Sequence, residues 1–237
     1  MRLLVYGMQS SGATAFTLFL AQRPDCLALV DILNNYAAPR VDTGLDMVVK
    51  AVVTTAYPLE VHRERFRPDR TVLLLRDPRD TYRSLSTKSY RNHSGLIDEK
   101  FALIDEVFAG REDHFDAVVH YEDFVARNPL VPAAMTALGW PVDDSFYDYR
   151  RRHEELAGAL WRHVPDLMDR IEFAFGNVQG RAVSERFRDK PRDPDLEAQA
   201  LEAQVLEAQA LEAKLETLCP RLLTHYRQRV PNLHPSA

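Results

Sequence analysis

Short apolar runs alternate along this chain with longer segments in which apolar residues recur every three or four positions. The runs have the length and composition of buried parallel strands, and we expect strands at residues 3–6, 26–32, 47–53, 71–75 and 117–120. The periodic segments predict helices at residues 11–22, 59–67, 80–88, 97–109 and 130–138. This alternation predicts an α/β fold with a parallel central sheet flanked by helices.

The predicted sheet has one edge at which ligands are expected to bind. In parallel sheets flanked by helices, ligands bind outside the carboxyl ends of the strands. We therefore expect the segments that follow four of the strands to surround one crevice; they are residues 7–14, 31–35, 54–58 and 76–80.

The C-terminal part of the chain follows a different pattern. Residues 196–218 repeat Leu-Glu-Ala-Gln-Ala with a period of five, and these strong helix formers predict a long C-terminal helix. A period of five matches neither 3.6 nor 3.5, so the leucines move around the helix, as expected of a loosely packed or solvated one. A homo-oligomer formed through this helix is the alternative, which sedimentation of a chain lacking residues 194–218 would test. We expect a first domain at residues 1–190 and a helical extension at residues 191–237.

Composition narrows the classes of function. The formal net charge of −5 over 237 residues argues against non-specific nucleic-acid binding. No apolar run is long enough to span a bilayer, and the N-terminal run is too short for a signal peptide, so we expect no membrane partner. The two cysteines, Cys26 and Cys219, lie far apart without metal-ligand spacing. This usage predicts a cytoplasmic protein without a metal site.

The segment after the first predicted strand has the pattern of a phosphate-binding loop. Gly7 and Gly12 are five positions apart and are followed by the hydroxyl residue Thr14. Glycine allows a tight turn with N–H groups directed at an anion, and the following helix adds its positive end. Nucleoside triphosphatases have Lys directly after the second glycine, where this chain has Ala13. The Gly7–Thr14 loop is therefore predicted to bind an anion without being an ATPase or GTPase loop. Its candidate binding residues are Gly7, Gln9, Ser10, Ser11, Gly12, Ala13 and Thr14.

A second candidate anion site follows the fourth predicted strand. The Arg76–Ser84 motif begins with Arg76 at the carboxyl edge of the sheet, where a guanidinium can bind a phosphate through two hydrogen bonds. Asp80 is expected to cap the following helix, and Ser84 lies one turn farther on. Together with the Gly7–Thr14 loop, the pair Arg76 and Ser84 predicts a ligand with two separated phosphates.

Three segments in series, followed by a short fourth one, resemble the sulfotransferases that use 3′-phosphoadenosine 5′-phosphosulfate (PAPS). That family has a loop of the form Gly-x-x-Arg/Lys-Ser-Gly-Thr-Thr and a motif of the form Arg-x-Pro-x-Asp-x-x-x-Ser. A Tyr-Glu-Asp-Leu segment follows its fifth strand, and a helix ending in Leu-Gly-x-Pro comes next. The corresponding segments here are Gly7–Thr14, Arg76–Ser84, Tyr121–Phe124 and Leu138–Pro141. The resemblance extends from Arg2 to about Tyr149 and implies a P-loop sulfotransferase-like fold.

The resemblance implies a role for each matching residue. The N–H groups of residues 11–14 and the hydroxyls of Ser11 and Thr14 would hold the 5′-phosphosulfate, and Arg76 and Ser84 the 3′-phosphate. Residues 1–190 would then be the PAPS-binding domain. Glu122 and Asp123 are expected to cap the next helix instead of contacting the nucleotide.

The loop departs from the family pattern at two positions. Ser10 stands where the family has its Arg or Lys, and Ala13 stands for the first Thr. Loss of one preorganised donor typically costs about 10²–10³ in rate, so either another cation enters the site, or catalysis is slow, or the protein only binds the nucleotide. The candidates are Lys50 on the third strand, and Arg181, Arg186 or Lys190 after residue 176. Residues 176–181 are polar and bounded by glycines, which suits either a lid over the nucleotide or a solvated loop.

Sulfuryl transfer needs a base that takes the acceptor proton across the crevice. Some family members use a His after the third strand, and this chain has none at that place. His62 is near, but its helix predicts an exposed position. Carbohydrate-directed members use a carboxylate after the second strand, so Asp31 is our candidate base, with a capping role as the alternative. The acceptor side is expected to include Asn34, Asn35, Tyr36, Thr54, Thr55 and Tyr57.

The combined interpretation is a sulfotransferase that moves a sulfuryl group from PAPS to a hydroxyl of a small molecule or carbohydrate, without a metal. A P-loop phosphotransferase is a second hypothesis; the missing Lys after Gly12 and the lack of a convincing magnesium-binding carboxylate count against it. A catalytically weak nucleotide-binding protein is the third, because of Ser10 and Ala13.

Overall fold

Five parallel strands form the centre of the molecule, as the sequence predicts. The computed structural model describes residues 1–30, 37–86, 95–168 and 197–229, with side chains of the last segment from residue 207 onward. The sheet has the order β2-β3-β1-β4-β5. Its strands are β1 (Arg2–Gly7), β2 (Cys26–Leu29), β3 (Asp46–Val52), β4 (Arg70–Leu75) and β5 (Ala117–His120). The fold is therefore α/β, with β1 between β3 and β4.

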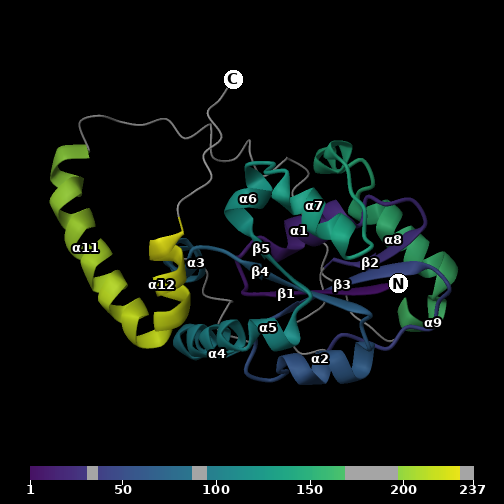
Figure 1. Cartoon of the computed structure of the whole chain (residues 1–237), viewed down its shortest axis with the longest axis horizontal. Coiled ribbons are helices and arrows are strands. Elements are labelled where there is room, and N and C mark those ends of the chain that lie inside the picture. The colour runs from purple at the N-terminus through teal and green to yellow at the C-terminus, as the bar shows by residue number, and fades with distance from the viewer. Residues whose placement is uncertain (31–36, 87–94, 169–196, 230–237) are drawn as a thin grey trace.

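Helices cover both faces of the sheet (Figure 1). One layer contains α1 (Ala13–Leu20), α6 (Tyr121–Val125), α7 (Leu130–Ala137) and η2 (Asp144–Asp148). The opposite layer contains α2 (Leu59–Phe66), α4 (Ile97–Ala109) and α5 (Arg111–His114). Near β2 lie α8 (His153–His163) and α9 (Pro165–Met168).

The alternating directions of the side chains along β1 explain why helices cover both faces of the sheet. Leu3 and Val5 pack into the same core as Phe16 of α1, whereas Leu4 and Tyr6 pack into the core on the other side of the sheet. Because successive side chains of a strand point to opposite faces, a strand that is apolar throughout must be covered on both sides. The Gly7–Thr14 loop leaves β1 where neighbouring connections turn to opposite faces, which is where ligands bind in such sheets.

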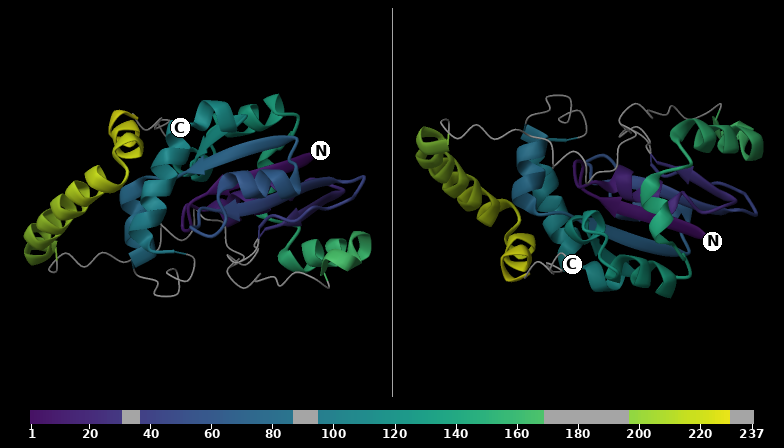
Figure 2. Two further views of the ribbon diagram at one scale, coloured as in Figure 1. Left: turned by 90° about the horizontal axis from the view of Figure 1, so that it is seen from below. Right: turned by 90° about the horizontal axis from the view of Figure 1, so that it is seen from above.

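The predicted long C-terminal helix is present as α11 (Glu197–Leu218), followed by α12 (Pro220–Gln228). Figure 2 shows α11 at one end of the molecule, beside α3 (Pro78–Ser86) and α4. Leu215 and Leu223 are fully buried in the core beneath α4. Ion pairs from Arg227 to two glutamates of α11 join the two helices. The expected boundary at residue 190 lies outside the described residues, and an oligomer through α11 stays a prediction.

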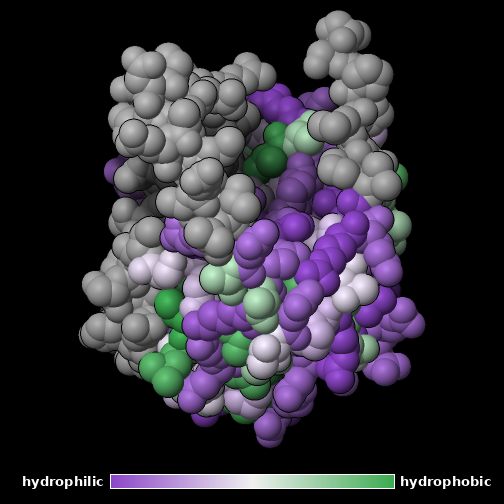
Figure 3. All heavy atoms as spheres, turned by 90° about the vertical axis from the view of Figure 1, so that its left-hand side faces the viewer, coloured by the Kyte–Doolittle hydropathy of each residue, from purple (hydrophilic) through white to green (hydrophobic). Residues whose placement is uncertain are grey.

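The outer surface of this end is mainly polar. Figure 3, which views the molecule from the side of α11 and α12, shows hydrophilic side chains predominating among the described residues. In the part of the chain that the structure describes, no helix is both long and apolar enough to cross a membrane.

Some predicted element boundaries shift by a few residues. α1 begins at Ala13 instead of residue 11, because the preceding positions form the turn. α3 begins at Pro78 instead of Asp80, and Asp77 accepts the backbone N–H of Arg79 at 2.9 Å. The expected capping role of Asp80 is therefore wrong, and Asp77 fills it. Helices α8 and α9 lie in a part of the chain for which we predicted no element, and α12 lies within the helical extension expected at residues 191–237.

Candidate anion-binding site

The Gly7–Thr14 loop is a tight turn that joins the centre of the sheet to α1. Gly12 adopts φ +88° and Ser10 adopts φ +65°. The backbone N–H and the hydroxyl of Ser11 both donate to the carbonyl of Met8, at 3.2 and 2.7 Å. The N-cap residue of α1 is Gly12, which has no side chain that could cap the helix. The first N–H groups of α1 therefore lack intrahelical acceptors and face the end of the loop, an arrangement that suits an anion.

Gly7 allows the loop to approach the neighbouring strand. A Cβ at Gly7 would lie 2.6 Å from the carbonyl oxygen of Leu74 on β4. Only glycine can therefore occupy this position without moving the backbone. Gly7 thus brings the loop close to β4, the strand that leads to Arg76.

Two loop hydroxyls differ in what they can donate. Ser11 uses its hydroxyl hydrogen on the Met8 carbonyl, so in this arrangement it can only accept a hydrogen bond. The Ser10 hydroxyl is buried and has no hydrogen-bond partner among the described residues. A buried polar atom without a partner is costly, and a bound anion would satisfy it. The Ser10 hydroxyl is therefore free to act as the donor that the resemblance implied for the Ser11 hydroxyl.

Arg76 lies against the loop, as expected from its place after β4. Its guanidinium donates to the carbonyl of Ser10 at 2.9 Å and lies 4.8 Å from the centre of the Tyr121 ring. Ser84 is half-buried on α3, which is the helix that follows Arg76. The structure thus brings the start of the Arg76–Ser84 motif to the Gly7–Thr14 loop.

Glu122 connects the Arg76–Ser84 motif to the C-terminal helix. Its carboxylate accepts the backbone N–H of Asp77 at 2.8 Å and the hydroxyl of Tyr226 at 3.2 Å. Arg229 pairs with Glu122 at 3.6 Å. Burial is the main cause that raises the pKa of Glu122, opposed by hydrogen bonds and by Arg229. Its expected role as a helix cap is thus incomplete, because it also holds the backbone that follows Arg76.

Lys50 reaches the loop from the sheet. It is 5% exposed on β3, and its Nζ donates to the Thr14 hydroxyl at 2.9 Å. Lys50 lies on the same face of β3 as Val48, which packs beneath α1. Of the candidate substitutes for the family cation, Lys50 is therefore in contact with the loop.

A second buried lysine contacts the loop and was not among the candidates. Lys100 of α4 is fully buried, and its Nζ donates to Oε1 of Gln9 at 2.9 Å. The sequence holds a signal for it, because Lys100 lies in the apolar stripe of α4 that includes Phe101 and Ile104. A charged residue at such a position must have a polar partner.

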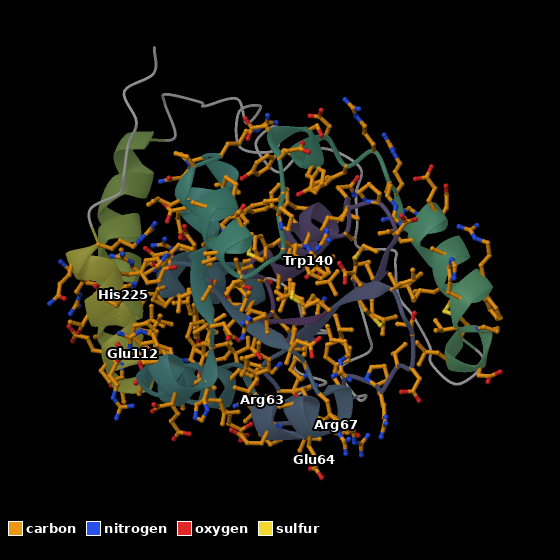
Figure 4. All side chains as sticks on the ribbon, turned by 45° about the vertical axis from the view of Figure 1, so that its right-hand side comes forward. Arg63, Glu64, Arg67, Glu112, Trp140 and His225 are labelled. Carbon is orange, nitrogen blue, oxygen red and sulfur yellow. The ribbon has the colours of Figure 1, made fainter. Side chains whose placement is uncertain are left out.

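His62 is buried, and its expected exposure is wrong. It is 2% exposed and packs with Phe66 on the inner side of α2. Exposed neighbours of His62 are labelled in Figure 4: Arg63 and Glu64 on the same helix, and Arg67 directly after it. The His62 Nδ1 accepts the N–H of Ala38 at 3.0 Å, and its Nε2 lies 3.2 Å from the Tyr57 carbonyl. Burial lowers its pKa to about 4, so the ring is neutral and joins two segments near the expected acceptor side.

Several candidates lie outside the described residues. They are Asp31, Asn34, Asn35, Tyr36, Arg181, Arg186 and Lys190. On the acceptor side, the Thr54 hydroxyl accepts the N–H of Tyr57 at 3.2 Å and so forms the turn after β3. In the described part of the chain, no three His, Cys, Asp or Glu side chains are grouped in a way that could hold a metal ion.

Comparisons with known proteins give matches in fold only. No family model and no curated protein matches the sequence. The mouse sulfotransferase SULT7A1 complexed with PAP aligns with a TM-score of 0.47 and 12% identity, over 91% of this chain and 84% of that one. A sulfotransferase from Alicyclobacillus acidocaldarius aligns with a TM-score of 0.40 and 14% identity, over 95% and 98%. Retinol dehydratase in complex with androsterone and inactive cofactor PAP aligns with a TM-score of 0.41 and 15% identity, over 98% and 83%. Two of the three are sulfotransferases by name.

Proposed function

We propose that this protein is a sulfotransferase that moves a sulfuryl group from PAPS to a hydroxyl of a small molecule or carbohydrate. The observation that carries the proposal is the contact between Lys50 and Thr14. It brings a buried cation to an anion-binding loop whose own sequence has none at Ser10 or Ala13. The departure from the family pattern is thus matched by a cation from a neighbouring strand.

The two ends of the nucleotide are assigned to two groups of residues. The N–H groups at the start of α1 and the hydroxyl of Ser10 would bind the 5′-phosphosulfate. Arg76 and Ser84 would bind the 3′-phosphate, with Arg181 as a further cation. The position of Arg76 beside the loop supports one ligand that contacts both groups.

The proposed reaction breaks the bond between the sulfur and the bridging oxygen of PAPS and forms a bond between the sulfur and the acceptor oxygen. Negative charge develops on the 5′-phosphate of the leaving nucleotide. Lys50 donates to the oxygen of Thr14, which directs the Thr14 hydroxyl hydrogen away from Lys50 and strengthens it as a donor. The pair would stabilise the leaving oxygen, and Asp31 is our proposed base for the acceptor proton.

The reducing cytoplasm is the proposed compartment. Cys26 and Cys219 are both free and buried thiols. Burial is the main cause that raises the pKa of each of them, to about 12. Both are therefore predominantly protonated at neutral pH, as expected of structural cysteines.

Two measurements test the proposal. Adenosine 3′,5′-bisphosphate (PAP) should raise the melting temperature of the purified protein, whereas ATP with Mg²⁺ should not, because a ligand stabilises the native state that binds it. Labelled sulfate should then pass from PAPS to an acceptor in a panel of phenols, alcohols and sugars. Stabilisation by ATP with Mg²⁺ alone would favour a phosphotransferase. Binding of PAP without any transfer would favour a nucleotide-binding protein of little activity.

A further inference from the structure

A fully buried lysine lies beneath the Gly7–Thr14 loop, on a different element from Lys50. Lys100 is 0% exposed, and the Gln9 side chain that it contacts is 2% exposed. The distance from Nζ of Lys100 to Oε1 of Gln9 is 2.9 Å. A buried ammonium group is expensive to desolvate, so its burial against the loop needs a polar partner there, and the Gln9 side chain supplies one.

The two buried lysines approach the loop from opposite faces of the sheet. Lys50 extends from β3 on the face covered by α1 and contacts Thr14 at the far end of the loop. Lys100 comes from α4 on the other face, among Phe101 and Ile104, and contacts the loop near its start. The loop is therefore flanked by one cation on each face.

The contact with Lys100 also fixes the orientation of the Gln9 side chain. An ammonium group is a donor only, so the carbonyl oxygen of the amide must face Lys100. Gln9 directly precedes Ser10, which adopts φ +65° and whose hydroxyl is buried. Lys100 thus holds the part of the loop whose backbone is left-handed and whose hydroxyl is available to an anion.

We propose that Lys100 is a positioning residue that, through Gln9, holds the loop ready for the 5′-anion and adds positive charge on its inner side. The inference rests on the proposed function, because it concerns the 5′-phosphosulfate end of the same nucleotide. It makes one specific claim: Lys100 strengthens binding of the 5′-phosphate and does not affect binding of the 3′-phosphate.

Calorimetry with two probes tests this claim on the full chain. PAP carries both phosphates, and adenosine 3′-monophosphate lacks the 5′-phosphate. Lys100→Met keeps much of the length of the side chain and removes its charge. Gln9→Glu keeps an acceptor for Lys100 and neutralises the local charge. Lys214→Met is the matched control, since Lys214 is a half-exposed lysine on α11 that pairs with Asp98.

We expect Lys100→Met and Gln9→Glu to weaken PAP binding about tenfold or more, as for the loss of a hydrogen bond to a charged group. Binding of adenosine 3′-monophosphate should stay within about twofold, and Lys214→Met should bind both probes like the wild type. The inference is overturned by a variant whose affinities for the two probes fall equally, and by one whose affinities both stay unchanged. If Lys100→Met does not fold, the result for Gln9→Glu decides. A wild type that does not bind PAP overturns the proposed function and this inference together, whereas unchanged variants of a PAP-binding wild type overturn the inference alone.

Discussion

The ring of Tyr121 lies directly against Gly12. A Cβ at Gly12 would come within 2.3 Å of Cδ2 and Cε2 of that ring. The guanidinium of Arg76 lies over the same ring, 4.8 Å from its centre. One aromatic side chain after β5 therefore contacts both the loop after β1 and the arginine after β4. We infer that it helps to set the separation between the two proposed phosphate positions.

The first prediction concerns Gly12→Ala. The new methyl group must displace the Tyr121 ring, and the residue must also keep a φ of +88°. We expect PAP binding to fall below detection and the free energy of unfolding to fall by more than the left-handed conformation alone costs, about 1–2 kcal/mol. Calorimetry and urea denaturation measure the two effects.

Gly139→Ala is the matched control for this variant. Gly139 has φ +79°, and a Cβ there would meet nothing within 4 Å. In Gly139→Ala the free energy of unfolding should therefore fall only by the cost of the left-handed conformation, and the affinity for PAP should stay unchanged. Equal effects of the two substitutions would contradict the role assigned to the contact between Gly12 and Tyr121.

The second prediction concerns the cation on β3. Lys50→Met should lower kcat for sulfuryl transfer by about 10²–10³, since it removes a donor to developing charge. KM for PAPS should change much less, because the loop N–H groups remain. Steady-state kinetics with labelled PAPS measures both constants. A variant with the wild-type kcat would remove Lys50 from the mechanism.

The third prediction concerns Arg76. Arg76→Ala removes its hydrogen bond to the Ser10 carbonyl and the proposed contact with the 3′-phosphate. We expect PAP to bind about 10- to 100-fold more weakly, as when a charge-assisted hydrogen bond is lost. The affinity for adenosine 5′-monophosphate, which lacks the 3′-phosphate, should fall less than the affinity for PAP. Arg83→Ala is the control, because Arg83 is exposed on α3, the helix that follows Arg76, and pairs with Asp80. Unchanged PAP binding by Arg76→Ala would refute the two-phosphate interpretation.

The fourth prediction concerns stability in acid. Burial lowers the pKa of His62 from 6.5 to about 4, so between these values the unfolded chain binds a proton that the folded protein does not. The stabilising contribution is complete above about pH 6.5 and is lost as the pH falls toward 4, at up to about 1.4 kcal/mol per pH unit. Burial, together with Arg229 and His225, lowers the pKa of His120 to about 3, which acts in the same direction.

Urea denaturation at several pH values between 4 and 7 tests this prediction. His62→Gln keeps an acceptor for Ala38 and a donor for the Tyr57 carbonyl, and it does not titrate. Its unfolding free energy should therefore depend less steeply on pH than that of the wild type. The slope that remains in the variant belongs to His120 and other groups. Equal slopes for the two proteins would mean that His62 does not have the lowered pKa.

Local patterns were sufficient to predict the sheet, because each strand is a short apolar run buried on both faces. The turn at Gly7 and Gly12 was predictable for a similar reason, since its backbone requirements are local. The buried position of His62 was not predicted, because the charged neighbours on α2 masked its place beside Phe66 on the inner side of that helix.

By itself, the sequence determined the parallel sheet, the loop after β1 and the arginine after β4. Tertiary structure alone decided which cations reach that loop. Lys50 and Lys100 are 36 and 91 residues from their partners Thr14 and Gln9. The sequence pattern of a strand or helix assigns a side chain to a face, but a contact depends on how two elements pack. The sequence named Lys50 among several candidates for the missing cation, and the packing of β3 and α4 around the loop decides that Lys50 and Lys100 contact it.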